Sequence, residues 1–256
     1  MLKKKPNRPA VEYIYGKHAV LEAMVARPDV VSDLHIAADF SDAAYLDKIL
    51  AHGHPLKTLK VKNPPRGVSA NANHQGVVAG IVPERLMMPY KNFISSLTVT
   101  QDIALLVLGE VQDPHNVGAV IRSAAAFGFA GVLIPPHNQA PVTGTVVKVS
   151  AGMAFRIPLV AIPNVNTAIR DLKERGFWVY GLAGEGSAST ATERFERPAL
   201  FVLGNEGEGL RAKTREECDE LISIPIHPRC ESLNAAAAAA VVMAAWSAQH
   251  GGALSR

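Results

Sequence analysis

Residues 102–128 read DIALLVLGEVQDPHNVGAVIRSAAAFG, an apolar run followed by a run with helical spacing. The apolar part, residues 102–111, is typical of a strand that is buried on both faces. Asp113 and Pro114 then predict a helix start, because an aspartate accepts hydrogen bonds from first-turn amides and proline lacks the N–H that would go unpaired there. A strand followed directly by a helix is the building unit of a parallel sheet.

The same alternation continues to the C-terminus. Strands are expected at 131–134, 157–162, 177–182, 199–203 and 221–226, and helices at 142–151, 165–175, 208–217 and 232–248. Strands that are apolar on both faces and alternate with helices predict a mostly parallel sheet covered on both sides. The expected fold class is therefore α/β, with residues 101–256 forming one domain.

A second and smaller unit precedes it. Helical spacing begins at Gly16, and further along come a strand at 30–37, a helix at 41–53 with Ser41 as its N-cap, a strand at 56–61, a short helical piece at 65–70 and a buried strand within 74–83. Residues 12–83 thus predict a small αβαβαβ sandwich. Pro83 and Pro89 interrupt the pattern, so residues 84–100 are expected to be a linker. Residues 1–11 are expected to be a disordered basic tail.

The composition indicates a globular protein. Of 256 residues, 48% are hydrophobic and 19% are charged, which is unlike a disordered chain. The longest apolar stretch, Ala235 to Trp246, is too short to cross a bilayer, and no apolar run follows the basic N-terminus as in a secretion signal. Cys218 and Cys230 form neither a CxxC pair nor a disulfide scaffold, so a cytoplasmic location is expected.

Charge is distributed unevenly along the chain. Residues 1–90 hold 12 Lys and Arg against 8 Asp and Glu, whereas residues 91–256 hold 14 against 15. The N-terminal part is therefore the expected place for contact with nucleic-acid phosphates. Its densest cluster comprises Lys57, Lys60, Lys62 and Arg66. An ordinary solvated basic face is the alternative.

Ligands of open parallel sheets bind beyond the carboxyl ends of the strands. Three segments there stand out: DPHNVGAVIR (113–122), LGNEGEGL (203–210) and IPIHPRCESLNA (224–235). Glycines in the middle segment allow backbone N–H groups to approach a nucleoside closely, although a purely structural turn is the alternative. The segment lacks GxGxxG spacing and comes near the end of the domain, which argues against a redox dinucleotide fold.

Side chains in the other two segments suggest a polar site. Arg122 shares a helix face with small residues such as Gly118 and Ala125, which leaves room for a phosphate, a ribose or a neighbouring chain. A surface arginine in an alanine-rich helix is the alternative. Ser232 or Asn234 can cap the last helix. No histidine lies in a zinc-ligand pattern, so no metal is expected.

Together these segments resemble the SpoU (TrmH) family of RNA ribose 2′-O-methyltransferases. The likeness rests on N-x-G-x-x-x-R at 116–122, LGNEGEGL at 203–210, and IPI followed by SLN within 224–234. KVSAG at 148–152 resembles a fourth family segment, although Met153 replaces the small residue expected next. YIYGKHAVLEA and HQGVVAG resemble the RNA-binding extension of the subgroup that methylates a guanosine in large-subunit (23S) ribosomal RNA.

This resemblance implies a fold and a cofactor. It implies a C-terminal SPOUT-type sheet domain with a trefoil knot, an N-terminal L30e-like RNA-binding domain, and a homodimer, joined through the C-terminal domain, with a composite active site. S-adenosylmethionine is the implied methyl donor, and no metal is needed. The residues expected to hold it are Gly204, Ile224, Leu233, Leu203, Gly209 and Pro225.

The resemblance also implies residue roles. Arg122 would act on the ribose hydroxyl, while the site would be ordered by Asn116, Glu206, Ser232 and Asn234. Because a guanidinium is not deprotonated in proteins, Arg122 fits an electrostatic role better than that of a base. The implied substrate is a guanosine of 23S ribosomal RNA. A tRNA methyltransferase, a non-catalytic RNA-binding member and a nucleotide-dependent oxidoreductase are the alternatives.

Overall fold

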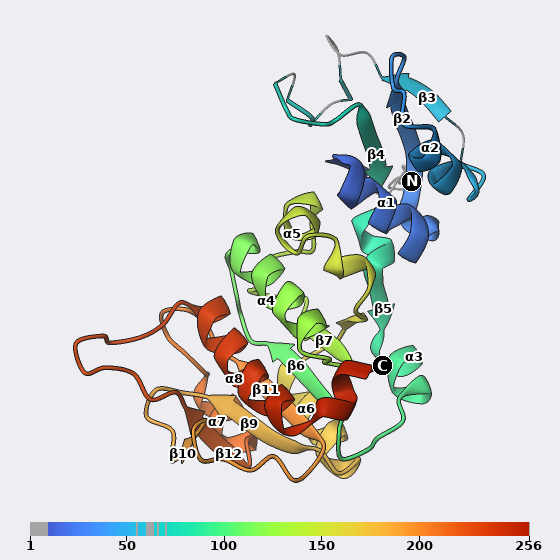
Figure 1. Ribbon diagram of the computed structural model, residues 1–256. Coiled ribbons are helices and arrows are strands. Elements are labelled where there is room, and N and C mark those ends of the chain that lie inside the picture. Colours follow the sequence, from blue (N-terminus) through green and yellow to red (C-terminus); the bar gives the residue numbers. More distant parts are fainter. Residues whose placement is uncertain (1–9, 55, 60–63, 66, 70, 256) are drawn as a thin grey trace, which may run out of the picture. The chain divides into compact units, whose positions relative to one another are not determined.

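The computed structural model describes residues 10–54, 56–59, 64–65, 67–69 and 71–255 (Figure 1). These residues form two compact units, which are described separately. The first unit comprises the described parts of Met1–Leu86 together with Val142–Arg156, and the second comprises Met87–Pro141 together with the described part of Ile157–Arg256. No helix within the described ranges has the length and apolar character needed to cross a membrane.

The second unit is built on an eight-stranded sheet in which every pairing is parallel. The strand order is β10-β12-β9-β11-β6-β7-β8-β5. The strands are β5 (Met87–Pro89), β6 (Ala104–Leu108), β7 (Gly131–Ile134), β8 (Leu159–Ala161), β9 (Trp178–Leu182), β10 (Ala188–Ser189), β11 (Ala199–Leu203) and β12 (Glu220–Ser223). The predicted α/β class and parallel sheet are confirmed.

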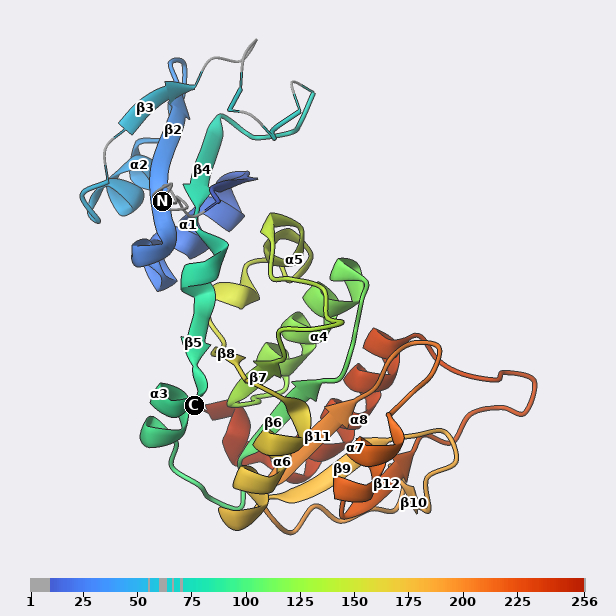
Figure 2. The same cartoon turned by 180° about the vertical axis from the view of Figure 1, so that it is seen from behind.

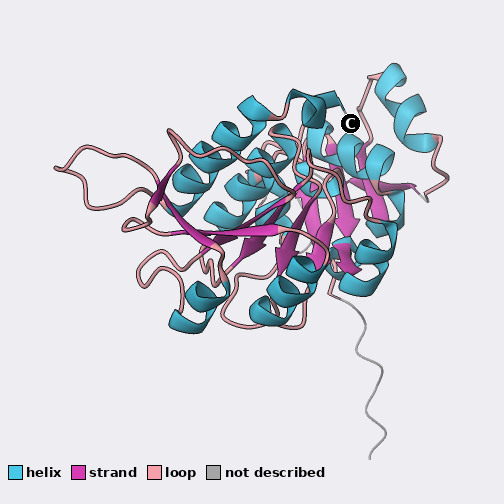
Figure 3. Cartoon of the chain, turned by 90° about the horizontal axis from the view of Figure 1, so that it is seen from below, coloured by secondary structure: helices cyan, strands magenta, loops and turns pink. Residues whose placement is uncertain are grey.

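Helices cover both faces of this sheet (Figures 2 and 3). They are α3 (Tyr90–Ser96), α4 (Pro114–Ala126), α6 (Val165–Glu174), α7 (Ala212–Glu217) and α8 (Ala235–Gln249). Alternate residues of the central strands face opposite layers, as the pleat requires. Val107 and Val202 pack in one core with Ile169 of α6, whereas Phe201 packs on Phe129, which contacts Trp246 of α8.

Capping explains where the helices α4 and α8 begin. Asp113 caps α4, accepting a hydrogen bond from His115 N at 2.8 Å, and Pro114 is the first helical residue, as predicted. Asn234, rather than Ser232, caps α8. The helix predicted over 208–217 begins only at Ala212, because residues 205–209 close a tight turn of their own.

The stretch expected to be a linker, 84–100, contains regular structure. β5 pairs with β8 at the sheet edge, and Phe93 of α3 is buried in the same core as Leu105. Residues 87–96 therefore pack as part of the second unit. A three-residue strand that ends in a proline is too short to produce a pattern in the sequence.

The first unit has a four-stranded sheet in the order β1-β4-β2-β3. Its elements are β1 (Glu12–Tyr15), α1 (Lys17–Ala26), β2 (Val31–Ala37), α2 (Ala43–Leu50), β3 (Leu56–Leu59), β4 (Val77–Ile81) and α5 (Gly144–Val149). The unit begins with a strand, so the predicted αβαβαβ order missed β1. Asp42 caps α2, accepting from Tyr45 N at 3.1 Å, which corrects the prediction of Ser41. The described residues of the short helical piece expected at 65–70 are not helical.

Residues 142–156 pack with this first unit, although the alternation placed them in the sheet domain. Lys148 Nζ donates to the hydroxyl of Tyr15 at 3.0 Å, Arg156 pairs with Glu22, and Gly144 N donates to a carboxylate oxygen of Glu12. The helical pattern of the segment is local, whereas its packing partners lie about 130 positions earlier in the chain.

Candidate active site

A cavity of about 370 Å³ lies at the carboxyl ends of β9, β11 and β12. We call it the first cavity. Its walls come from residues 182–185, 203–210 and the segment from Ile222 to Ala238. Seven of the residues predicted for the site line it: Leu203, Gly204, Glu206, Gly209, Ile224, Ser232 and Leu233. Asn116, Arg122, Pro225 and Asn234 are not among the lining residues.

The turn at 205–209 forms one wall and depends on glycine. Asn205 N donates to Gly209 O at 2.9 Å, and Gly209 N donates to Asn205 O at 3.0 Å. Gly209 has φ +68°, which disfavours a side chain, and a Cβ on Gly204 would lie 2.6 Å from the carbonyl oxygen of Gly209. The backbone can therefore close this tightly only with glycine at 204 and 209.

The same turn is attached to the neighbouring strand. Asn205 Nδ2 donates to Glu110 O at 3.0 Å, and Gly109 N donates to Leu203 O at 2.6 Å. Asn205 Oδ1 also accepts from the backbone N–H of Gly207 at 2.9 Å. The ends of β6 and β11 are thus fixed side by side, and the turn is held against both.

A chain of amide hydrogen bonds joins the three predicted segments. Asn116 Nδ2 donates to Glu206 Oε1 at 3.1 Å, and Asn116 Oδ1 accepts from Asn234 Nδ2 at 2.9 Å. Asn234 Oδ1 in turn accepts from the backbone N–H of Ala236 at 2.9 Å. The hydrogen-bond partners distinguish the oxygen from the nitrogen in each of these two side-chain amides. The orientation of the Asn116 side chain is therefore fixed at the edge of the first cavity.

Arg122 lies apart from this chain of contacts. It is exposed on α4, and within the described residues it makes no hydrogen bond or ion pair. It lies six positions after Asn116, which corresponds to about 9 Å along a helix. The fold of one chain thus brings Asn116, Glu206, Ser232 and Asn234 together and leaves the guanidinium of Arg122 outside the first cavity.

The first cavity combines apolar walls with an excess of negative charge. Four glutamates line it, at positions 185, 206, 208 and 231, against the single cation Arg215. Arg215 Nη1 is 2.5 Å from Glu185 Oε1, and this hydrogen bond lowers the pKa of Glu185. Leu203, Ile224 and Leu233 supply apolar surface. The arrangement favours a small ligand with an apolar part and a positive charge.

One part of the first cavity was missed at the sequence level. Leu182, the last residue of β9, lines the cavity beside the glycine turn, together with Ala183, Gly184 and Glu185, which follow the strand. The signal was present, because this segment also follows an apolar strand and ends in a Gly-Glu-Gly sequence at 184–186.

The predicted basic cluster is only partly described. Lys57 is exposed on β3, with Nζ 3.8 Å from Asp33 Oδ2. Lys60, Lys62 and Arg66 lie outside the described residues. In the portion of the chain that the structure describes, no group of three or more His, Cys, Asp and Glu residues is placed to hold a metal ion.

Comparison with known proteins gives a consistent result. A family model described as "SpoU rRNA Methylase family" matches residues 104–244. The chain is 46% identical over 179 residues to "23S rRNA (guanosine-2′-O-)-methyltransferase RlmB" of Xanthomonas campestris pv. campestris, covering 69% of this chain and 71% of the relative. The protein of the same name from Vibrio vulnificus is 34% identical over 235 residues, covering 91% and 94%.

The fold also matches solved structures. The SpoU methyltransferase AviRb from Streptomyces viridochromogenes, in complex with the cofactor AdoMet, superposes with a TM-score of 0.74 at 23% identity, covering 93% of this chain and 90% of that one. This likeness concerns the fold alone. The resemblance seen in the sequence motifs is confirmed by the family match and by relatives along most of the chain: the protein belongs to the SpoU rRNA methylase family.

Proposed function

We propose that this protein transfers a methyl group from S-adenosylmethionine to the 2′-hydroxyl of a guanosine in 23S ribosomal RNA. The observation that carries the proposal is the chain of hydrogen bonds from Glu206 through Asn116 to Asn234 at the edge of the first cavity. The relatives from Xanthomonas campestris and Vibrio vulnificus are both named as 23S rRNA (guanosine-2′-O-)-methyltransferases.

The first cavity fits the proposed donor in size and charge. About 370 Å³ lies within the range of small-molecule sites, roughly 300–1,000 Å³. The residues proposed to hold the methyl donor are Leu203, Gly204, Gly209, Ile224, Pro225 and Leu233. Pro225 does not line the cavity itself, but it lies between the lining residues Ile224 and Ile226 and is proposed to contribute through its backbone. The excess of carboxylates favours a ligand that carries a sulfonium and an ammonium group. It disfavours NAD and ATP, whose phosphates are negative.

Methyl transfer needs an activated hydroxyl and a stabilised oxyanion. When bound, S-adenosylmethionine supplies a methyl group already activated by the positive sulfonium, so the proposed reaction uses no metal. Asn116, held by Glu206 and Asn234, orients the ribose. Ser232 lines the first cavity and adds a hydroxyl to the same edge.

Arg122 is proposed to grip the adjacent phosphate and to stabilise the forming oxyanion. Its guanidinium stays protonated, so a phosphate oxygen or a water takes the hydroxyl proton. Because Arg122 lies outside the first cavity of its own chain, we propose that it completes the site of a second copy. The protein would then be a homodimer joined through the sheet domain, with α4 and the neighbouring α8 at its interface. Val241 on α8, with 41% of its surface exposed, supports this choice.

Finer features of the fold belong to the same proposal. We propose that the segments around the first cavity thread as a trefoil knot, which the convergence of residues 203–210 and 222–238 on one cavity supports.

Residues 12–83 are proposed to be an L30e-like RNA-binding domain, supported by the positive charge of the N-terminal part and by exposed Lys57. A cytoplasmic location is proposed because both cysteines are free thiols.

Methylation of 23S ribosomal RNA by the purified protein tests the proposal. Ribose methylation is mapped by mass spectrometry after incubation with S-adenosylmethionine, and one methylated guanosine is expected. No transfer to this RNA by protein that binds S-adenosylmethionine would contradict it.

A further inference from the structure

A second cavity of about 370 Å³ lies on the other side of the glycine turn. It is lined by Gly109 and Glu110 after β6, by residues 164–166 at the start of α6, and by residues 211–214 at the start of α7. Gly209 and Leu210 line both cavities. The turn is therefore a shared wall between the proposed cofactor site and a second space that the proposed reaction does not use.

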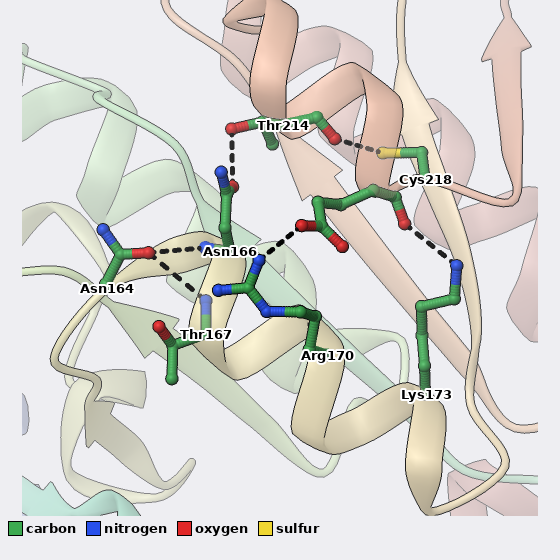
Figure 4. Close-up of polar contacts among 8 residues, drawn as sticks. Asn164, Asn166, Thr167, Arg170, Lys173, Thr214 and Cys218 are labelled. Carbon is green, nitrogen blue, oxygen red and sulfur yellow. Dashed lines mark hydrogen bonds and ion pairs between the residues drawn. The ribbon is translucent and has the colours of Figure 1, made fainter.

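Two amide groups in the lining are fixed as donors. Asn164 Oδ1 accepts from the backbone N–H groups of Asn166, at 2.9 Å, and Thr167, at 3.2 Å, so its nitrogen points away from α6 (Figure 4). Asn166 Oδ1 accepts from Thr214 Oγ1 at 2.9 Å, and Thr214 is buried. Neither amide nitrogen has a hydrogen-bond partner within the described ranges, so both remain free to bind a ligand.

The charged residues of this lining leave a positive excess. Glu110 is paired with Arg211 Nη2 at 2.7 Å, so the only carboxylate in the lining is already neutralised. Lys213 is exposed and has no ion pair among the described residues. The start of the ten-residue helix α6 adds partial positive charge. In contrast to the first cavity, whose lining cation Arg215 is paired with Glu185, this one offers unpaired amide donors and an unpaired cation among the described residues.

We propose that the second cavity binds a phosphate group of the RNA strand, at a nucleotide near the one that is methylated. Lys213 supplies the charge, and the side-chain nitrogens of Asn164 and Asn166 donate to the phosphate oxygens. The shared wall places this phosphate next to the cofactor cavity. The inference rests on the proposed function, because it takes the ligand to be the RNA substrate.

The test uses two double variants with the same change of charge. Lys213→Gln with Asn164→Asp removes the cation and turns one donor into a repelling carboxylate, while aspartate keeps the cap of α6. Lys91→Gln with Asn92→Asp makes the same change on exposed positions of α3, away from both cavities. The readouts are RNA affinity over a range of salt concentrations, the KM for RNA, the affinity for S-adenosylmethionine, and the melting temperature.

The Lys213 and Asn164 double variant should bind RNA about tenfold more weakly, the size of one lost hydrogen bond to a charged group. The slope of log affinity against log salt concentration should be less negative by about 0.7, which is the contribution of one phosphate contact on a single strand. Cofactor affinity and melting temperature should stay at the parent's values, and the Lys91 and Asn92 variant should match the parent throughout. Unchanged RNA affinity, or equal weakening in both double variants, would overturn the inference.

A free nucleotide is the other source of the same phosphate chemistry. If guanosine 5′-monophosphate binds the RNA-free parent, and the Lys213 and Asn164 variant loses this binding while keeping its RNA affinity, the cavity takes a mononucleotide and the inference is wrong. Failure of the proposed function can be told apart from failure of this inference. If the proposed function is wrong, the parent protein transfers no methyl group, whereas the RNA-binding measurements do not depend on catalysis.

Discussion

Asn234 donates a hydrogen bond to Asn116 at 2.9 Å, joining the start of α8 to the first turn of α4 across 118 positions of sequence. The same Asn234 caps α8, and the same Asn116 donates to Glu206. Helix capping and site geometry therefore share one set of side chains. A change at Asn116 should disturb the geometry of the site more than the stability of the fold.

Replacing Asn116 with alanine tests this directly. The variant should transfer methyl groups about 100-fold more slowly, because a misplaced group near the reacting atoms can cost that much. Its melting temperature should change little, since Asn234 keeps its bonds to the α8 amides. Single-turnover rates and calorimetric unfolding are the measurements. A large loss of stability with a normal rate in the folded fraction would contradict the assignment.

Arg122→Lys should lose most of the activity although the charge is kept, because lysine cannot form the paired hydrogen bonds of a guanidinium. The fold should be unaffected, since Arg122 is exposed and makes no hydrogen bond or ion pair within the described residues. If the site is composite, mixing Arg122→Lys with a variant that cannot bind cofactor should restore part of the activity. Mixed dimers without any restored activity would argue against the composite site.

Gly204→Ala should weaken the binding of S-adenosylmethionine, because the added Cβ would lie 2.6 Å from Gly209 O and push the turn away. Such overpacking costs about 1–3 kcal/mol. Gly207→Ala is the matched control, since its nearest neighbour, Asn205 Oδ1, would lie at 3.6 Å. Calorimetric titration of both variants gives the answer. Equal cofactor affinity in the two would show that the turn does not shape the site.

The two thiols should react very differently. Burial raises the pKa of Cys218 to about 11, and its thiol also lies 3.2 Å from Thr214 O, whereas Cys230 is exposed. Because the thiolate is the reactive form, iodoacetamide at pH 8 should label Cys230 and spare Cys218, whose labelling should rise only as the pH approaches 11. Peptide mass spectrometry quantifies both sites. Rapid labelling of Cys218 at pH 8 in folded protein would be inconsistent with its burial.

Local signals predicted much of the second unit. The strand and helix around Asp113 and Pro114 follow from apolar patterning and capping, which depend on neighbours in sequence. β1 and β5 were missed because strands of three or four residues carry too little pattern, and β5 is held by its pairing with β8. The packing of residues 142–156 with the first unit depends on distant partners such as Tyr15.

The sequence placed the candidate site residues in part. Hydrogen bonds join Asn116, Glu206 and Asn234, which the family resemblance had grouped in one site, while their roles in the reaction stay predictions. The contribution of Glu185 was missed, although the Gly-Glu-Gly sequence at 184–186 follows an apolar strand in the same way as the glycine-rich segment 203–210. Arg122 lies outside the first cavity because of its place two turns into α4 and because of the direction in which α4 runs. The sequence gives the first of these two facts, and only the structure gives the direction of the helix.

A crystal structure of the protein grown with S-adenosylmethionine shows whether the first cavity binds the methyl donor. We expect electron density for the donor between Gly204, Ile224 and Leu233, with its methyl group facing the edge formed by Asn116 and Glu206. Density for the donor at a different place, with this cavity filled only by water, would contradict it.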